Sequence, residues 1–265
     1  PISLHQKCIE HLKIFLLIGG MPEVVASYIE NGSLLECQQI LDDLTKTFYD
    51  DFAKYKERTS VSQLREVFNA VIQQAGKKFV FSNIQGINQL QVKKGVEMLE
   101  MAGLIYPITH TSANGLPLGA EINNKHKKFM LFDCGIYQRY LQLNIAQILS
   151  ADSFDAINKG AIAELFVATE LKKSTPANNS SELYYWRREQ QGSQAEVDFV
   201  VQDGEDIVPI EVKAGLKGSM QSMFLFLKEK NKKYGIRTSL ENFGKFDNIK
   251  IYPLYAIACA AGGAS

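Results

Sequence analysis

The chain has few of the features that mark whole classes of protein. Its cysteines, Cys8, Cys37, Cys134 and Cys259, lie far apart and form no CxxC pair. In a chain of 265 residues, this spacing excludes a disulfide framework and favours a reducing, cytoplasmic setting. No apolar run approaches the roughly 18 residues of a membrane span, so we expect no membrane partner.

Several catalytic motifs are also absent. The sequence contains no GxxxxGK[ST] loop, no HExxH pair and no GxSxG turn, so this chain has no ATP-binding P-loop of its own. The histidines, His5, His11, His110 and His126, are scattered along the chain and do not indicate a zinc site. Residue 1 is Pro rather than Met, so we expect a processed protein or an excised fragment.

Neither sign of charge is in excess. The 29 basic and 29 acidic residues give a net charge of zero, and a composition of 46% hydrophobic and 22% charged residues is typical of a globular protein. The net charge differs between segments: it is −3 for residues 1–56, +4 for 57–128, 0 for 129–150 and −1 for 151–265. A neutral total therefore does not exclude DNA, although it argues against strong non-specific binding.

The first half of the sequence predicts helices followed by a hairpin. Residues 1–56 have apolar positions at helical spacing, interrupted at Gly19-Gly20-Met21-Pro22, with Ser33 as a cap for a third helix. A helix from Val61 to near Gly76 and a short helix at 82–85 come next. A third helix at 89–101 follows, with an apolar stripe of Leu90, Val92, Val96, Leu99 and Met101.

Strands are expected at 104–108 and 128–132, across a polar loop at 109–127. Helix, short helix, helix and hairpin is the order of a winged helix-turn-helix, which we assign to residues 57–132. Residues 133–158 are expected to form a helical connector.

The second half, residues 159–265, predicts an α/β domain with a central mixed sheet. Helices are expected at 161–173 and 219–230, and strands at 183–188, 196–201, 207–214, 234–239 and 250–257. The predicted fold class is therefore a multidomain α+β or α/β chain: a helical segment, a winged helix and an α/β domain.

A pair of predicted strands in this domain has the residue types of a metal site. Strict alternation would place Val197, Phe199 and Val201 on one face of the first strand and Glu196 and Asp198 on the other. In the second strand, after a turn at Asp203-Gly204, Glu211 and Lys213 would share a face with Asp198.

Two carboxylates beside an ammonium group suit Mg²⁺ and an activated water. Glu164, on the preceding helix, is a third candidate ligand, and Glu196 is an alternate one. The alternative is a solvated hairpin edge with cross-strand ion pairs of little energetic value.

Nucleic-acid contacts are a second hypothesis. Amides in the winged helix would contact base edges, and basic side chains would contact phosphates. The candidates are Gln89, Gln91, Lys93, Lys94, Lys125, Lys127, Lys128, Arg187 and Arg188. The alternative is that the winged helix is a packing module and the arginines are ordinary soluble surface.

Several segments together resemble one family. They are GGMPEVV at 19–25, LEMAGLI at 99–105, AEVDF at 195–199 with IEVKAG at 210–215, GIRTS at 235–239 and PLYA at 253–256. This combination resembles prokaryotic AAA-type ATPases with a C-terminal domain of unknown function. The resemblance implies a missing N-terminal core, which would bind ATP, and residues 1–56 as the end of the ATPase lid.

The resemblance also implies a restriction-endonuclease-like fold for residues 159–265. That superfamily's acidic and lysine positions fall on Glu164, Asp198, Glu211 and Lys213, which implies a Mg²⁺-dependent deoxyribonuclease of the PD-(D/E)xK type. Two other readings stay open. In one, the nuclease-like domain is a regulatory module; in the other, the winged helix contacts DNA and the C-terminal domain forms a homo-oligomer.

Overall fold

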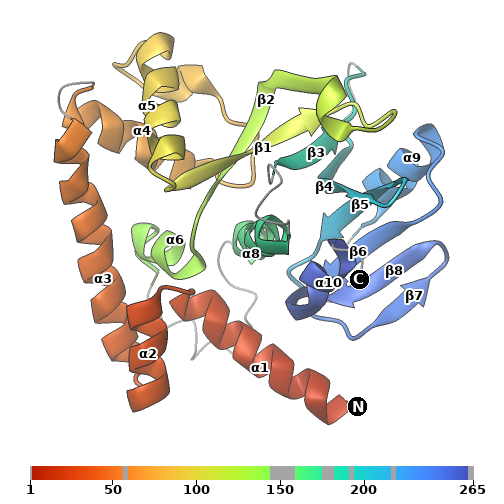
Figure 1. Ribbon diagram of the computed structural model, residues 1–265, viewed down its shortest axis with the longest axis horizontal. Coiled ribbons are helices and arrows are strands. Elements are labelled where there is room, and N and C mark those ends of the chain that lie inside the picture. The colour runs from red at the N-terminus through yellow and green to blue at the C-terminus, as the bar shows by residue number, and fades with distance from the viewer. Residues whose placement is uncertain are drawn as a thin grey trace. The chain divides into compact units, whose positions relative to one another are not determined.

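The computed structural model describes residues 2–55, 59–143, 159–174, 182–190, 194–215 and 219–261, and its architecture is mixed α+β. Those residues contain nine α-helices and one eight-stranded mixed sheet (Figure 1). The helices are α1 (Ile2–Ile18), α2 (Pro22–Asn31), α3 (Leu34–Asp51), α4 (Val61–Gln73), α5 (Gln89–Met101), α6 (Cys134–Tyr140), α8 (Lys159–Ser174), α9 (Gln221–Glu229) and α10 (Ile257–Ala261). The strands are β1 (Ile105–Thr111), β2 (Ile122–Leu131), β3 (Leu183–Arg187), β4 (Glu196–Asp203), β5 (Asp206–Val212), β6 (Gly235–Ser239), β7 (Gly244–Phe246) and β8 (Ile249–Pro253). Short 3₁₀ helices are η1 (Phe52–Tyr55), η2 (Phe81–Asn83), η3 (Leu118–Glu121) and η4 (Leu254–Ala256).

The chain divides into two compact units, and the boundary between them crosses α1, β1 and β2. The sheet unit comprises Pro1–Ile9, Pro107–Lys127 and Lys159–Ser265, and the helical unit comprises Glu10–Tyr106 and Lys128–Asn158. Among the described residues, no helix is both long enough and apolar enough to pass through a lipid bilayer.

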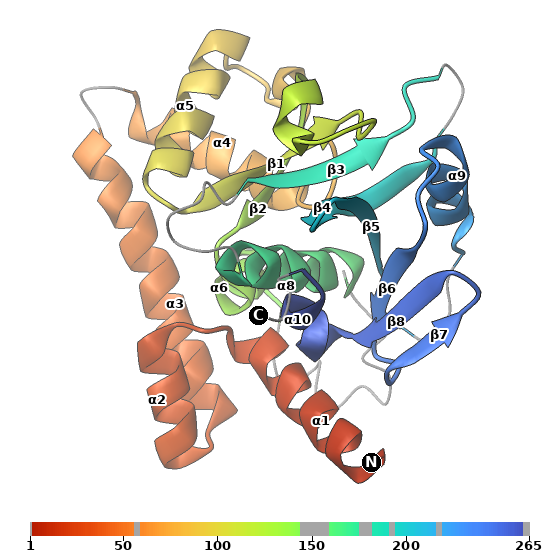
Figure 2. The same cartoon turned by 45° about the vertical axis from the view of Figure 1, so that its right-hand side comes forward.

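The sheet has the strand order β2-β1-β3-β4-β5-β6-β8-β7. The pairs β1–β3, β5–β6 and β6–β8 are parallel, whereas β3–β4, β4–β5 and β7–β8 are antiparallel. Six consecutive residues of β5 are buried, so both of its faces are covered, and α8 and α9 both pack against it (Figure 2). This central strand carries Glu211, and Lys213 follows it directly.

Strand β4 contains a bulge that the alternating pattern did not predict. Tyr184 pairs with Val200, but Trp186 pairs with Val197, so the register shifts by one residue between them. Val197 and Val200 therefore join the same buried cluster beneath α9, where Trp186 packs edge-on against Phe226 at 5.1 Å. The prediction that Val197, Phe199 and Val201 share one face through strict alternation is wrong across this bulge, since a bulge re-aims the side chains beside it.

The helical unit is organised by the break between α1 and α2. Gly19 adopts a left-handed conformation with φ +74°, and the Asp133 carboxylate accepts hydrogen bonds from the Gly20 N–H at 2.7 Å and the Ile136 N–H at 2.9 Å. Asp133 thus holds the Gly-Gly turn and caps α6 at the same time. Pro22 occupies the first turn of α2, as expected.

The predicted cap of α3 is confirmed, because Ser33 Oγ accepts from the Glu36 N–H at 3.3 Å. Farther along the unit, Tyr49, Phe68 and Tyr140 form a cluster of edge-to-face contacts, with ring centroids 4.9–6.0 Å apart. Edge-to-face packing is favourable because the positive rim of one ring meets the negative face of the next.

Three expectations about element boundaries and faces are wrong. The return strand begins at Ile122 rather than 128, so the polar connection is shorter than 109–127. Leu90 and Met101 are exposed, because each lies two residues beyond the stripe of Val92, Val96 and Leu99 and so falls on the opposite side of α5. The strand expected at 250–257 ends at Pro253.

The residues after Pro253 form η4 and the start of α10, since an apolar run without alternation does not distinguish strand from buried helix. In the expected connector, α6 is present, whereas 144–158 lies outside the described residues.

Candidate functional site

The strongest sequence candidate lies where β4 and β5 separate. The two strands pair from Asp203 opposite Asp206 to Phe199 opposite Ile210, as the predicted hairpin requires. Beyond that point the Val212 N–H donates to Asp198 Oδ2 at 2.8 Å, so a side-chain carboxylate takes the place of a strand carbonyl. The next amide, that of Lys213, donates to the Thr238 carbonyl at 2.8 Å on the β6 side. Asp198 is therefore fixed against the backbone between Glu211 and Lys213.

Glu211 and Lys213 form a close ion pair at this strand end. Lys213 Nζ lies 2.6 Å from Glu211 Oε1, and the side chains are only 22% and 8% exposed, respectively. A carboxylate that is this buried loses hydration, and the ammonium group offsets that cost. Removing either partner would leave a charge in a desolvated position, so the pair has consequences for stability as well as for chemistry.

Two other sequence candidates lie on neighbouring elements. Glu164 is half-buried on α8, the helix that packs against β5. Glu196 is the first residue of β4, and its backbone N–H donates to Ser222 Oγ at 3.3 Å. Among the described residues, Glu164, Asp198 and Glu211 do not form a group whose ligand atoms all lie within 4.8 Å of one another.

The described strand end thus brings together Asp198, Glu211 and Lys213, but not a cage of three carboxylates. The donor set fits a hard cation nevertheless, because Mg²⁺ is usually held by one or two carboxylates and keeps several waters. Each carboxylate has two oxygens and about four lone-pair sites, so a carboxylate of this kind can accept a hydrogen bond and bind a cation at the same time.

The residues proposed to contact nucleic acid differ in their exposure to solvent. Gln89, Lys93 and Lys94 are exposed on α5, and Lys125 is exposed on β2, with Lys127 half-buried. Lys128 is only 1% exposed, so the prediction that it contacts phosphate is wrong: its ammonium group is not at the surface.

Two more of these candidates are already engaged. Gln91 Oε1 accepts from the Asn88 N–H at 3.4 Å in a capping box at the start of α5. Arg188 is paired with Glu229, whereas Arg187 is half-buried on β3. Helix capping and ion pairing account for these two side chains without a ligand.

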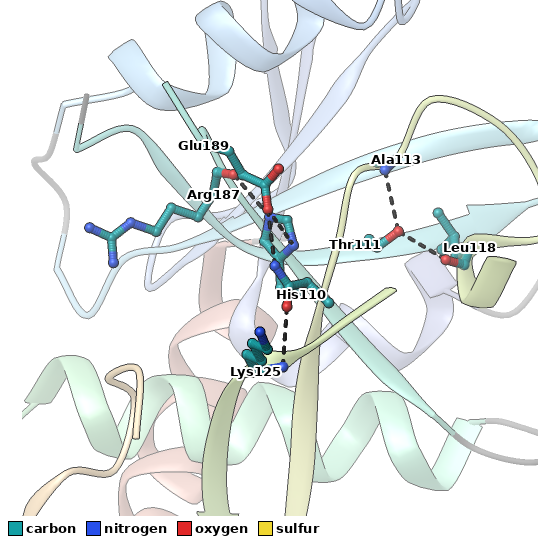
Figure 3. A network of polar contacts seen from close by, with 8 residues as sticks. His110, Thr111, Ala113, Leu118, Lys125, Arg187 and Glu189 are labelled. Carbon is teal, nitrogen blue, oxygen red and sulfur yellow. Dashed lines mark hydrogen bonds and ion pairs between the residues drawn. The ribbon is translucent and has the colours of Figure 1, made fainter. Parts of the chain in front are cut away.

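The structure also brings together residues that the sequence did not connect. His110 and His126 are far apart in sequence, but they lie on the neighbouring strands β1 and β2 with ring centroids 5.8 Å apart. Glu189 follows β3 and lies beside His110 (Figure 3). The pairing of β1 with β2 could have indicated the histidine contact, but the expected start of the return strand at 128 excluded His126 from that strand.

Comparison with known families divides the chain into two parts. Residues 9–147 match the family model described as a domain of unknown function, DUF8612. Residues 159–257 match a second domain of unknown function, DUF4143, which is commonly found with AAA ATPases. No curated protein and no solved structure matches the chain. Because the first model covers more than half of the 265 residues, the chain belongs to the DUF8612 family.

Proposed function

We propose that the chain is the C-terminal part of an AAA-type ATPase and that its sheet unit is a metal-dependent nuclease of the PD-(D/E)xK type. The observation that carries the proposal is the buried Glu211–Lys213 pair, 2.6 Å apart, next to the Asp198 carboxylate on the Val212 amide. The match to a domain commonly found with AAA ATPases supports the larger assembly, with ATP bound by an N-terminal core.

The roles follow from the chemistry of the side chains. Asp198 and Glu211 would hold a divalent cation, and the Val212 amide orients one of these carboxylates. A bound cation lowers the pKa of a coordinated water and stabilises charge on a phosphodiester. Lys213, an ammonium group with three donors, would orient the attacking water or offset charge at the scissile phosphate. Glu164 would act as a further ligand through a bridging water.

The test is cleavage of single- and double-stranded DNA by the whole chain with Mg²⁺ or Mn²⁺. Asp198→Ala and Lys213→Ala are expected to abolish cleavage, because each removes a group at the strand end. Glu205→Gln is the matched control, since Glu205 is exposed in the turn of the same hairpin. Equal cleavage by all four proteins would indicate a contaminating nuclease and refute the proposal. Circular dichroism of each variant distinguishes a loss of cleavage from a loss of folding.

A second candidate function is DNA binding by the winged helix-turn-helix expected at residues 57–132. It is favoured by the exposed lysines Lys93 and Lys94 on α5, and by the order of the elements in that range. In this alternative the nuclease-like fold is a structural or regulatory module. Lys93→Glu with Lys94→Glu should weaken DNA binding and reduce its salt dependence, since each phosphate contact contributes about one unit of the slope. Lys46→Glu, at an exposed position on α3, is the control. Salt-dependent binding without cleavage would favour this function over the nuclease.

A further inference from the structure

The three strands at one side of the sheet bring two histidines and a carboxylate into one group. His110 is on β1, His126 on the neighbouring strand β2, and Glu189 lies two residues past the end of β3. One ligand atom from each residue lies within 4.8 Å of the other two. Figure 3 shows the Glu189 carboxylate directed at the His110 ring. These residues are separate from Asp198, Glu211 and Lys213, so the group is independent of the proposed nuclease site.

The contacts of His110 define which ring nitrogen is available. Nε2 lies 3.0 Å from the Arg187 carbonyl oxygen. Since a carbonyl oxygen only accepts, Nε2 must carry the hydrogen, and in the neutral ring the lone pair is then on Nδ1. A metal-binding histidine typically donates its second N–H to a backbone carbonyl in this way, which fixes both the tautomer and the ring orientation.

Nδ1 of His110 lies in an environment suited to a cation. The residue is 1% exposed, and among the described residues Nδ1 has no hydrogen-bond partner. Glu189 Oε1 lies 3.9 Å from Nδ1, beyond hydrogen-bond distance. Two acceptor atoms therefore lie 3.9 Å apart, one on an enclosed ring and one on an exposed carboxylate. A positive charge between them would satisfy both lone pairs.

We propose that His110, His126 and Glu189 form a binding site for a divalent transition-metal ion of the zinc class. Two imidazole nitrogens and one carboxylate are the donors that Zn²⁺ accepts, whereas Mg²⁺ and Ca²⁺ prefer oxygen alone. Adjacent ligands of a tetrahedral zinc ion lie about 3.4 Å apart at bond lengths near 2.0–2.1 Å. The ligand atoms lie within 4.8 Å of one another, so the largest approach that binding requires is about 1.4 Å.

Glu189 supplies that movement, because its side chain is 56% exposed while His110 is enclosed. Asn123 Nδ2 donates to Glu189 Oε1 at 3.2 Å and holds the carboxylate near the histidines. Three protein ligands leave a fourth position for water or a small anion. The ion would link β1, β2 and the segment after β3, so its binding would stabilise the folded sheet unit.

The experiment uses the whole metal-free chain and Zn²⁺ alone, in competition with a chromogenic chelator. We expect one Zn²⁺ per chain, a higher Tm with Zn²⁺, and at least a tenfold loss of affinity in His126→Gln and in Glu189→Gln. His11→Gln, at an exposed position on α1, should bind like the wild type. The variants leave the buried His110 unchanged, so folding of the site's core is preserved.

Co²⁺ substitution identifies the ligands. Tetrahedral visible bands without thiolate charge-transfer bands support the site. Thiolate bands would assign the metal to Cys8 or Cys259 and overturn the proposal. Unchanged Zn²⁺ affinity in both ligand variants, or no measurable Zn²⁺ binding, would also overturn it. Because cleavage of DNA is not measured, failure here leaves the proposed nuclease unaffected.

Discussion

Gly19→Ala should destabilise the helical unit far more than an ordinary glycine substitution at positive φ. A left-handed conformation costs an L-residue about 1–2 kcal/mol. The new Cβ would also lie 2.2 Å from Asp133 Oδ1 and 2.6 Å from Oδ2, so the carboxylate must move. That movement breaks the hydrogen bonds from the Gly20 and Ile136 amides, and the buried Ile136 amide left unsatisfied costs about 1–3 kcal/mol. The expected total is about 2–5 kcal/mol.

Gly32→Ala is the matched control for this prediction. Gly32 also has positive φ, at +63°, but a Cβ there would meet no atom within 4 Å. Its loss should therefore be only the conformational cost of about 1–2 kcal/mol. Urea unfolding followed by far-UV circular dichroism measures both, since Trp186, the single tryptophan, belongs to the sheet unit and would not report on the helical unit.

Equal losses for the two glycine variants would refute the steric reasoning. A double mutant provides a further check, because Asp133→Ala removes the atoms that the new Cβ would meet. In that background Gly19→Ala should cost no more than Gly32→Ala does in the wild type, a non-additivity of about 2 kcal/mol. Additive losses would show that Gly19 and Asp133 do not act as a unit.

Two further predictions concern the same unit. Asp133→Ala should lower the free energy of unfolding by about 2–4 kcal/mol, because two amides lose a charged acceptor. In the same urea titration, Asp43→Ala, at an exposed position on α3, should change the free energy of unfolding by less than about 0.5 kcal/mol. Similar losses for the two variants would contradict the capping role of Asp133. Burial, and to a smaller extent Tyr49, raises the pKa of Tyr140. Its contribution to stability is therefore complete below the unfolded pKa of about 10 and declines as pH rises above it. Tyr140→Phe should flatten the alkaline part of the stability profile, and an unchanged slope would argue against this assignment.

Local chemistry made much of the fold predictable. The sequence predicts the break after Ile18, the cap at Ser33 and the hairpin turn at Gly204, since glycine, proline and short polar side chains at these positions act on the residues next to them. The β4–β5 pairing followed from the same turn. Predictions that needed information from distant residues were less accurate: the exposure of Leu90 depends on which face of α5 is packed, and the end of β8 depends on what covers Leu254.

The two candidate sites show why a site is harder to predict than a strand. Residue types placed Asp198, Glu211 and Lys213 together correctly, because one tight hairpin relates all three. The alternation rule nevertheless misassigned faces on β4, because a bulge opposite Tyr184 and Trp186 cannot be read from β4 alone.

The histidine group depends on three chain segments up to 79 residues apart, from His110 to Glu189. No spacing motif connects such residues; what joins them is strand order, with β2 beside β1 and β1 beside β3. A parallel pair such as β1–β3 requires a long crossover, so its partners are necessarily distant in sequence. In a mixed sheet of this kind, the sites formed within hairpins are visible in the sequence, and the sites formed across crossovers appear only once the strand order is known.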